Sequence, residues 1–296
     1  MSLFNKKKIL ITHDSTFHTD DLFATATLSI LNNGNVKIIR TRDPKIFQTG
    51  DYVYDVGGEN ISEKNLFDHH QKGGAGSRPN GIPYASFGLV WKTYGEQICG
   101  SKEVADKIDE KLVQPIDASD NGIDLCKFTG EVKPLFFQDI FYSFKPSWKE
   151  DQDIDKAFMQ VLPLAIKILK REIIKTRDDL EAYSYVENIY NKTENKKLIV
   201  LDKNYPWGEN LVTHSEPLLA VYPRVDGKWG VGTVPKILGS YERRLDLPES
   251  WAGKRDKELV EITGVADAVF CHNGRFMVVA GSRAGAIKLA EKALIS

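Results

Sequence analysis

Short β-type runs alternate with a helical pattern at the start of the chain, and this alternation most constrains the fold. Strand-like runs occupy 7–13, 35–43, 51–59 and 64–70, and the helical pattern at 20–33 separates the first two runs. Strands separated by helices are typical of βαβ units, whose strands lie parallel in one sheet. We therefore predict an α/β fold with a doubly wound, mainly parallel sheet in the N-terminal part.

The length of 296 residues suggests two domains, since a typical domain has ~100–200 residues. We predict an N-terminal domain at 1–150, a helical connector at 151–192 and a smaller α/β domain at 193–296, with the last strand–helix unit included. Proline interrupts or kinks a helix because it lacks a backbone N–H. We therefore expect a kink or break at Pro163 in the connector, and a loop at Pro115 between two helices.

The composition limits the class of protein and its compartment. Apolar residues at 42% and charged residues at 27% are ordinary for a folded protein, and a net charge of −1 means that any nucleic-acid contact needs a local basic cleft. Three widely spaced cysteines without a CxxC pair indicate neither disulfides nor a thiolate zinc site. The start lacks the pattern of a secretory signal, and no apolar run approaches 18 residues. We expect a cytoplasmic protein without membrane contact.

Four of the six histidines lie within the first 70 residues, beside acidic residues at predicted strand ends. The clusters are 13–21, Asp55 and 68–70, while Asp117 and Asp120 lie in a loop that ends a helix. Each cluster alone has an ordinary explanation as a helix cap, a turn or a solvated loop. In open α/β sheets, however, the carboxyl ends of the strands adjoin a ligand-binding crevice. Carboxylates crowded there repel one another unless a cation neutralises them, so we predict a metal site.

The ligand types narrow the choice of metal. Imidazole mixed with carboxylate, without thiolate, fits Mn²⁺ and also Zn²⁺, Co²⁺ or Fe²⁺, whereas Mg²⁺ prefers oxygen ligands. More candidate ligands are present than one ion needs, which indicates two ions about 3.5–4 Å apart that share a carboxylate. We expect Mn²⁺, and the other divalent cations stay open.

Six motifs occur in a specific order along the chain. They are THDSTFHTDD (12–21), RTRDP (40–44), DVGGE (55–59), FDHHQ (67–71), YASFGLVWKTYG (84–95) and DASDNG (117–122). This combination resembles the melanocyte-proliferating-gene family of metal-dependent hydrolases, within the DHH phosphoesterase superfamily that includes the RecJ exonucleases. The resemblance spans nearly the whole chain. It implies a DHH-type N-terminal domain, a C-terminal domain that holds the nucleotide, and an active site in the cleft between them.

The resemblance also implies a role for each motif residue, beginning with two cation sites that share Asp55. The first site is His13, His18 and Asp55, and the second is Asp20, Asp55, His69 and Asp120. His70 would contact the scissile phosphate, Asp68 would orient a ligating histidine, and a hydroxide between the ions would be the nucleophile. Two features depart from the broader superfamily. His18 stands where an aspartate is common, and the C-terminal loop AGSRAGA lacks the usual glycine-rich run with histidine.

Arginines near predicted helix and strand ends are candidates for binding the substrate. Arg283, with Ser282 at the start of the last helix, is placed to hold a phosphate, although a solvated arginine at a plain helix end explains it equally well. Arg40 and Arg42 follow a strand end. Either they pair with carboxylates of the crevice or they contact the substrate.

Three functions stay open from the sequence. The resemblance implies a 3′-to-5′ exonuclease acting on single-stranded RNA or short oligonucleotides. The alternatives are a hydrolase of a small phosphoanhydride or dinucleotide, and a metal-binding regulatory protein without catalysis. We expect the nuclease, because groups beyond the ligands, such as His70, are not needed for metal binding alone. RNA or an oligonucleotide is then the expected partner, and a homodimer stays open.

Overall fold

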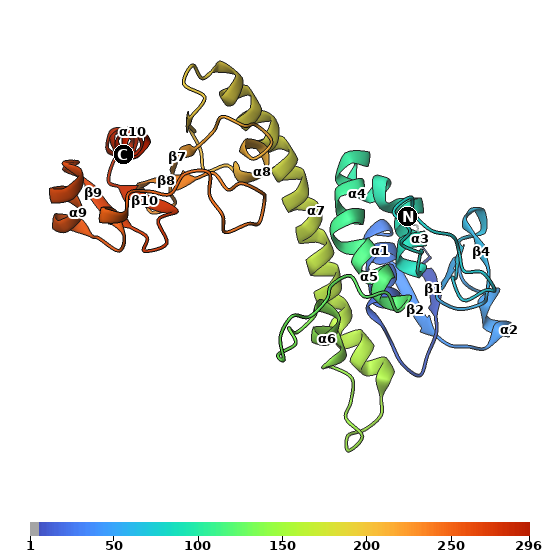
Figure 1. The fold of residues 1–296 in the computed structure, drawn as a ribbon. Helices are drawn as coiled ribbons and strands as arrows, with labels where there is room; N and C mark the ends of the chain where they lie inside the picture. The colour runs from blue at the N-terminus through green and yellow to red at the C-terminus, as the bar shows by residue number, and fades with distance from the viewer. Residues whose placement is uncertain (1–5) are drawn as a thin grey trace, which may run out of the picture. The chain divides into compact units, whose positions relative to one another are not determined.

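A computed structural model describes residues 6–296, and its contacts divide the chain into two compact units. The first unit ends at Arg177 and the second comprises Asp178–Ser296. Each unit contains a β-sheet with helices, so the predicted α/β class is confirmed (Figure 1). Between residues 6 and 296, no helix has both the length and the apolar composition needed to cross a bilayer. The expectation about a secretory signal rests partly on residues 1–5, which lie outside the described residues.

The first unit is built on a five-stranded sheet with the order β2-β1-β3-β5-β4. The strands are β1 (Lys8–Thr12), β2 (Val36–Arg40), β3 (Tyr52–Tyr54), β4 (Asn60–Ile61) and β5 (Leu66–Phe67). The edge strand β4 is antiparallel to β5, whereas the other pairs are parallel. Leu10 and Ile11 in β1 are fully buried, as expected for a parallel strand covered on both faces. The carboxyl ends of four parallel strands therefore lie along one edge.

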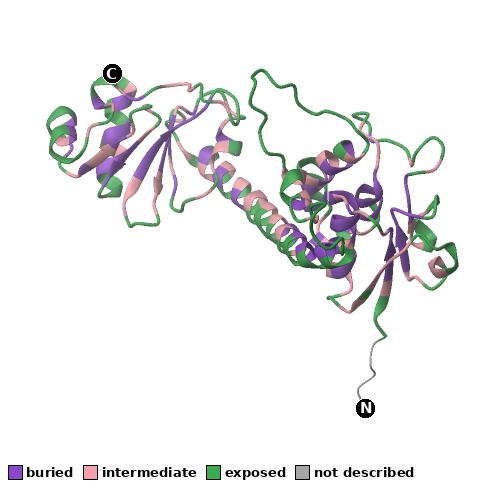
Figure 2. Ribbon diagram, turned by 90° about the horizontal axis from the view of Figure 1, so that it is seen from below, coloured by how far each residue is buried: buried purple, intermediate pink, exposed green. Residues whose placement is uncertain are grey.

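Helices α1 (Thr19–Leu31) and α3 (Ser86–Cys99) pack against each other. Every residue of α1 from Thr19 to Ser29 is buried, which makes it an interior helix (Figure 2). The short helix α2 (Pro44–Phe47) adds Phe47 to a cluster with Ile11 and Val53. A single turn of 3-10 helix, η1 (Ser62–Lys64), precedes β5. The interior position of α1 matters for function, because two candidate ligands lie at its start, His18 as the N-cap residue and Asp20 in the first turn.

Helix α4 (Lys102–Ile108), a π-helical segment η2 (Asp109–Val113) and α5 (Gln114–Asp120) follow one another without a break. The predicted loop at Pro115 is therefore wrong. Pro115 lies in the first turn of α5, directly after the π-helical segment. Hydrogen bonds in a π-helix join residues i and i+5. Because the wider turn skips one hydrogen bond, proline can follow it although it has no backbone N–H to donate.

The stretch 122–136, which we call the aromatic loop, has no helix or strand and is exposed along its length (Figure 2). It leads into α6 (Phe137–Tyr142), and the 39-residue helix α7 (Ile154–Lys192) follows. Helix α7 continues through Pro163 without interruption. The boundary between the two units falls within α7.

The second unit contains a mixed five-stranded sheet with the order β6-β7-β8-β10-β9. Strand β6 pairs parallel with β7, and the other neighbours are antiparallel. Its elements are β6 (Leu198–Val200), α8 (Gly208–Leu211), β7 (Leu219–Pro223), β8 (Trp229–Thr233), the 3-10 turn η3 (Glu249–Trp251), α9 (Asp256–Thr263), β9 (Ala268–Cys271), β10 (Met277–Ala280) and α10 (Arg283–Ile295). Val231 and Val278 share an apolar core with Leu289 of α10, so this helix covers one face of the sheet.

Candidate metal centre

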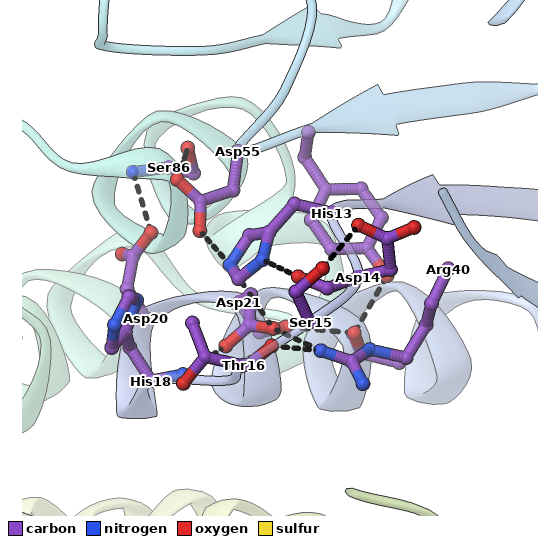
Figure 3. A network of polar contacts seen from close by, with 12 residues as sticks. His13, Asp14, Ser15, Thr16, His18, Asp20, Asp21, Arg40, Asp55 and Ser86 are labelled. Atoms are coloured by element: carbon purple, nitrogen blue, oxygen red, sulfur yellow. Dashed lines mark hydrogen bonds and ion pairs between the residues drawn. The ribbon is translucent and has the colours of Figure 1, made fainter. Parts of the chain in front are cut away.

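Imidazole and carboxylate side chains meet at the carboxyl edge of the first sheet (Figure 3). His13 directly follows β1, Asp55 directly follows β3, and His69 lies two residues beyond β5. Because these three strands are parallel neighbours, their ends lie side by side. His13 and Asp55 are each only 2% exposed.

Short distances join these side chains through Asp55. One carboxylate oxygen of Asp55 lies 3.2 Å from His13 Nε2, and the other lies 3.4 Å from His69 Nε2. His69 Nε2 is also 3.2 Å from the carboxylate of Asp120, at the end of α5. His18 Nδ1 approaches Asp120 to 4.0 Å. Asp55 therefore stands between two histidines, with one oxygen facing each.

Three groups of side chains are close enough to hold a metal ion, with the ligand atoms of each group within 4.8 Å of one another. The groups are His13, His18 and Asp55; Asp55, His69 and His70; and Asp20, His69 and Asp120. All six predicted metal ligands occur in these groups. His70, for which we predicted contact with the substrate phosphate, occurs there too.

Asp55 adopts a left-handed backbone conformation with φ +56°. Aspartate and asparagine reach this region more readily than most residues, because their short polar side chains can hydrogen-bond locally. Gly57 and Gly58 follow with φ +103° and +73°, and the Gly58 amide donates to the Asp68 carboxylate at 2.6 Å. The turn after β3 is thereby tied to the end of β5, which keeps Asp55 and His69 together.

Burial and mutual contacts shift the pKa values in the cluster. Burial lowers the pKa of His69, but the contacts with Asp120 and Asp55 outweigh it and raise the pKa to about 11. Burial raises the pKa of Asp55, but His13 and His69 outweigh this effect and hold the pKa below its ordinary value. Burial, followed by the nearby carboxylates, raises the pKa of Asp20 well above its ordinary value. The charged form of these buried carboxylates therefore needs a positive charge close by.

Buried polar atoms without a hydrogen-bond partner include His69 Nε2, Asp21 Oδ2 and Arg40 Nε. Buried polar atoms are nearly always paired, so an unpaired one points to an ion or a function. His69 Nε2 lies between the carboxylates of Asp55 and Asp120, where a cation would take both imidazole nitrogen and carboxylate oxygen as ligands. These residues therefore fit a divalent cation, and the donor set does not select one metal.

Asp68 holds the ring of His70. One carboxylate oxygen of Asp68 accepts hydrogen bonds from His70 Nδ1 at 2.7 Å and from the backbone amide of His69 at 2.8 Å. The side chain of His70 is 61% exposed. The resemblance implies that Asp68 orients a histidine that binds metal. In the structure, Asp68 instead contacts the ring of His70, which is not one of the predicted metal ligands.

Asp21 and Arg40 extend the cluster along α1 (Figure 3). Asp21 accepts a hydrogen bond from the His18 amide at 2.7 Å, and its other oxygen lies 3.6 Å from His13 Nε2. Burial raises the pKa of Asp21 to about 7. Arg40 approaches Asp21 to 3.8 Å and pairs with Asp155 of α7 at 2.6 Å, so it contacts carboxylates. From the sequence, we predict no role for Asp21, although its position three residues after the helix cap is the spacing of a capping box.

A buried ion pair fixes α5, which carries Asp120. Arg78 donates to Asp117 at 2.7 Å and to both oxygens of Asp109 at 2.9 and 2.7 Å. Asp117 also accepts a hydrogen bond from the amide of Gly88 in α3 at 3.0 Å. A Cβ atom at position 88 would lie 1.9 Å from the Asp117 carboxylate, so glycine is required there. These contacts set the position of α5 against α3.

The predicted substrate-binding residues have partners of their own. Arg42 is exposed, with Nε 3.6 Å from Asp14. In the second unit, Ser282 Oγ donates to Asp267 at 2.6 Å, and the Arg283 guanidinium lies 5.9 Å from the centre of the Trp229 ring. The Asp267 carboxylate therefore already lies at the start of α10. Contact of Ser282, Arg283 or Arg42 with a substrate stays a prediction.

Manganese is expected to stabilise the folded protein. Mn²⁺ at about 100 times its dissociation constant should raise the free energy of unfolding by about 2.7 kcal/mol per site, because only the folded chain brings these ligands together. Urea unfolding with Mn²⁺ and with EDTA measures the effect. His69→Ala should lose about half of it, the share of the cation site that includes His69, while the control His214→Ala, in the second unit, should retain all of it. An equal Mn²⁺ effect in both variants would contradict the assignment of His69.

Known proteins resemble this chain along nearly its whole length. The family model MYG1_exonuc, described as an uncharacterised protein family (UPF0160), matches residues 9–294. The protein named MYG1 exonuclease from Mus musculus is 31% identical over 322 residues, which cover 96% of this chain and 84% of the mouse protein. The MYG1 protein of Dictyostelium discoideum is 31% identical, with 96% of each chain covered. The MYG1 protein of Chlamydia trachomatis is 32% identical over 273 residues, with 90% of each chain covered.

Proposed function

We propose, since this chain belongs to the MYG1 exonuclease family, that it is a metal-dependent phosphoesterase of the nuclease type. The names of its mammalian relatives support a nuclease. The observation that carries the proposal is Asp55, which presents one carboxylate oxygen to His13 and the other to His69. One carboxylate shared by two cations is a recurrent arrangement in enzymes that cleave phosphodiesters.

The residues of the cluster would divide between two cations. One would be held by His13, His18 and Asp55, and the other by Asp20, Asp55, His69 and Asp120. When bound, the cations supply a nucleophile at neutral pH and stabilise the charge that develops during in-line displacement at phosphorus.

His70 would contact the substrate phosphate. Its ring is exposed, and the hydrogen bond to Asp68 occupies Nδ1. Nε2 is thereby left to donate to a phosphate oxygen. Asp68 would act as a positioning residue, because it holds the ring of His70 in one orientation.

The finer proposal names Mn²⁺ as the metal and RNA as the substrate. Mn²⁺ accepts the mixed imidazole and carboxylate set that the cluster offers. The substrate we propose is single-stranded RNA or a short oligonucleotide, shortened from its 3′ end. This polarity follows from the family resemblance of the motifs.

With Mn²⁺, the protein is expected to shorten a 5′-labelled single-stranded RNA stepwise and to release mononucleotides. The test assays this RNA, a dinucleotide and pyrophosphate side by side, with Mn²⁺, Mg²⁺, Zn²⁺, Co²⁺ or EDTA. Asp55→Asn protein purified in the same way controls for contaminating nucleases. Hydrolysis of the dinucleotide or pyrophosphate without cleavage of the RNA would favour a small-molecule hydrolase. Tight metal binding without hydrolysis of any of these substrates would rule out an enzymatic function and favour a metal-binding regulatory protein.

A further inference from the structure

A cavity of about 630 Å³ lies beside the metal centre, and none of the proposed roles uses it. It is lined by residues of η2, α5, the aromatic loop, α6 and α7, all within the first unit. Its volume falls in the range of about 300–1,000 Å³ that is typical of ligand sites. Ser119 and Gly122 both line the cavity, and Asp120 stands between them in the sequence.

The cavity is lined by aromatic rings, which are Phe128, Phe136, Phe137 and Tyr142. The rings of Phe128 and Phe136 lie 5.7 Å apart and are tilted by 55°. These two side chains are 42% and 39% exposed, although large apolar groups usually lie inside. Exposed aromatic rings are the surfaces on which proteins stack the bases of single-stranded nucleic acids.

Tyr142 links the cavity to the metal centre. Its ring lines the cavity and also packs edge-on against His18, with 6.4 Å between the ring centres. Asp120 faces His18 at 4.0 Å and His69 at 3.2 Å. A nucleotide whose phosphate lies at the metal centre would therefore find the cavity next to it.

The charges of the cavity favour an uncharged ring over a phosphate. Asp124, Asp139 and Glu172 are among its lining residues. Lys111 also lines the cavity, and its ammonium group already pairs with Glu172 at 2.5 Å. Carboxylates repel phosphate, but they accept hydrogen bonds from the amino groups of a base.

We propose that this cavity binds the base of the nucleotide whose phosphate lies at the metal centre. The inference rests on the proposed function and deepens it, because it makes the substrate a nucleotide chain rather than an inorganic phosphoanhydride. An apolar segment of another protein is the competing occupant.

The test compares a 5′-labelled RNA with an RNA of equal length whose 3′-terminal residues lack bases. The double variant Phe128→Ala/Phe136→Ala is expected to lower kcat/KM on the complete RNA by roughly 5- to 100-fold, the range found when base stacking on an aromatic ring is removed. Turnover of the base-free RNA should change by less than about twofold. Phe144→Ala is the matched control, since this ring is similarly exposed but does not line the cavity.

An equal loss on both RNAs would overturn the proposal, because the two rings would then support the metal centre itself. No loss on either RNA would also overturn it and would leave a protein segment as the occupant. Binding of 2-aminopurine ribonucleoside 5′-monophosphate in the presence of Zn²⁺, which the mixed imidazole and carboxylate set accepts, gives a readout that needs no turnover, because stacking quenches its fluorescence. If the wild-type protein cleaves no RNA, the proposed function fails. Quenching that is lost in the double variant but kept in Phe144→Ala would still support the base site, and its absence in the wild type would refute it.

Discussion

Asp55→Asn is expected to lower metal-dependent turnover on the order of 10³-fold or more, at least the loss caused by removing one charge-stabilising group from an active site. The reason is geometric, because the two oxygens of Asp55 face His13 and His69, and within residues 6–296 no other carboxylate pairs with both histidines. Asparagine is the right replacement, since it tolerates the left-handed backbone at this position. Metal analysis after dialysis should show that the variant holds fewer ions than the wild-type protein.

Asp51→Asn provides the matched control at the opposite end of β3. Asp51 is a partly exposed carboxylate that pairs with Lys8 at 2.8 Å, outside the cluster. This variant should keep full metal content and turnover. Unchanged metal content and turnover in Asp55→Asn would show that Asp55 is not a shared ligand.

Arg78→Ala is expected to lower the free energy of unfolding by about 3–5 kcal/mol at pH 8, the usual effect of breaking a buried ion pair. The Arg78 side chain is 4% exposed and the Asp117 side chain is fully buried, so the variant leaves a carboxylate inside the protein without its partner. Urea unfolding measures the loss. Metal affinity should fall as well, because Asp120 lies on the helix that this pair fixes.

This loss is expected to shrink as the pH falls. Burial raises the pKa of Asp117 to about 7, even though Arg78 lowers it, and removing Arg78 raises the pKa further. The folded variant then binds a proton that the unfolded chain, with an ordinary aspartate pKa, releases, so its stability falls as the pH rises. The difference between wild type and variant should therefore be smaller at pH 5.5 than at pH 8.5.

Two controls separate the unpaired charge from lost packing. Arg78→Ala/Asp117→Asn removes the charge and should recover part of the stability. Lys102→Ala breaks an exposed ion pair with Asp106 and should leave the unfolding curve unchanged. A double variant as unstable as Arg78→Ala would show that packing, and not the unpaired carboxylate, causes the loss.

The meeting of His13, Asp55 and His69 at one sheet edge could be predicted from the sequence. Each follows a short apolar run, and parallel strands end at the same edge. This step needs only that the strands lie parallel in one sheet, which the alternation of strand and helix patterns predicts. The strand order comes from the structure. The role of each side chain as a ligand stays a prediction until metal is measured.

The support of Asp120 could not be predicted. Asp117 pairs with Arg78, 39 positions away, and with the amide of Gly88, 29 positions away. Contacts between such distant segments depend on how the helices pack, and packing leaves no periodic signal in a single sequence. The predicted loop at Pro115 is also wrong. Proline breaks a helix when it follows an α-helical turn, whereas the turn before Pro115 is π-helical.

The π-helical segment Asp109–Val113 also fixes the angular phase of α5. Each residue of a helix advances the side-chain direction by about 100°. Losing one residue in this segment would rotate Asp117 and Asp120 together, away from Arg78 and His69. A change in the length of a loop between other elements does not rotate a helix in this way. In relatives, the number of residues between 109 and 120 should therefore be as diagnostic of the metal centre as the identity of the aspartates themselves.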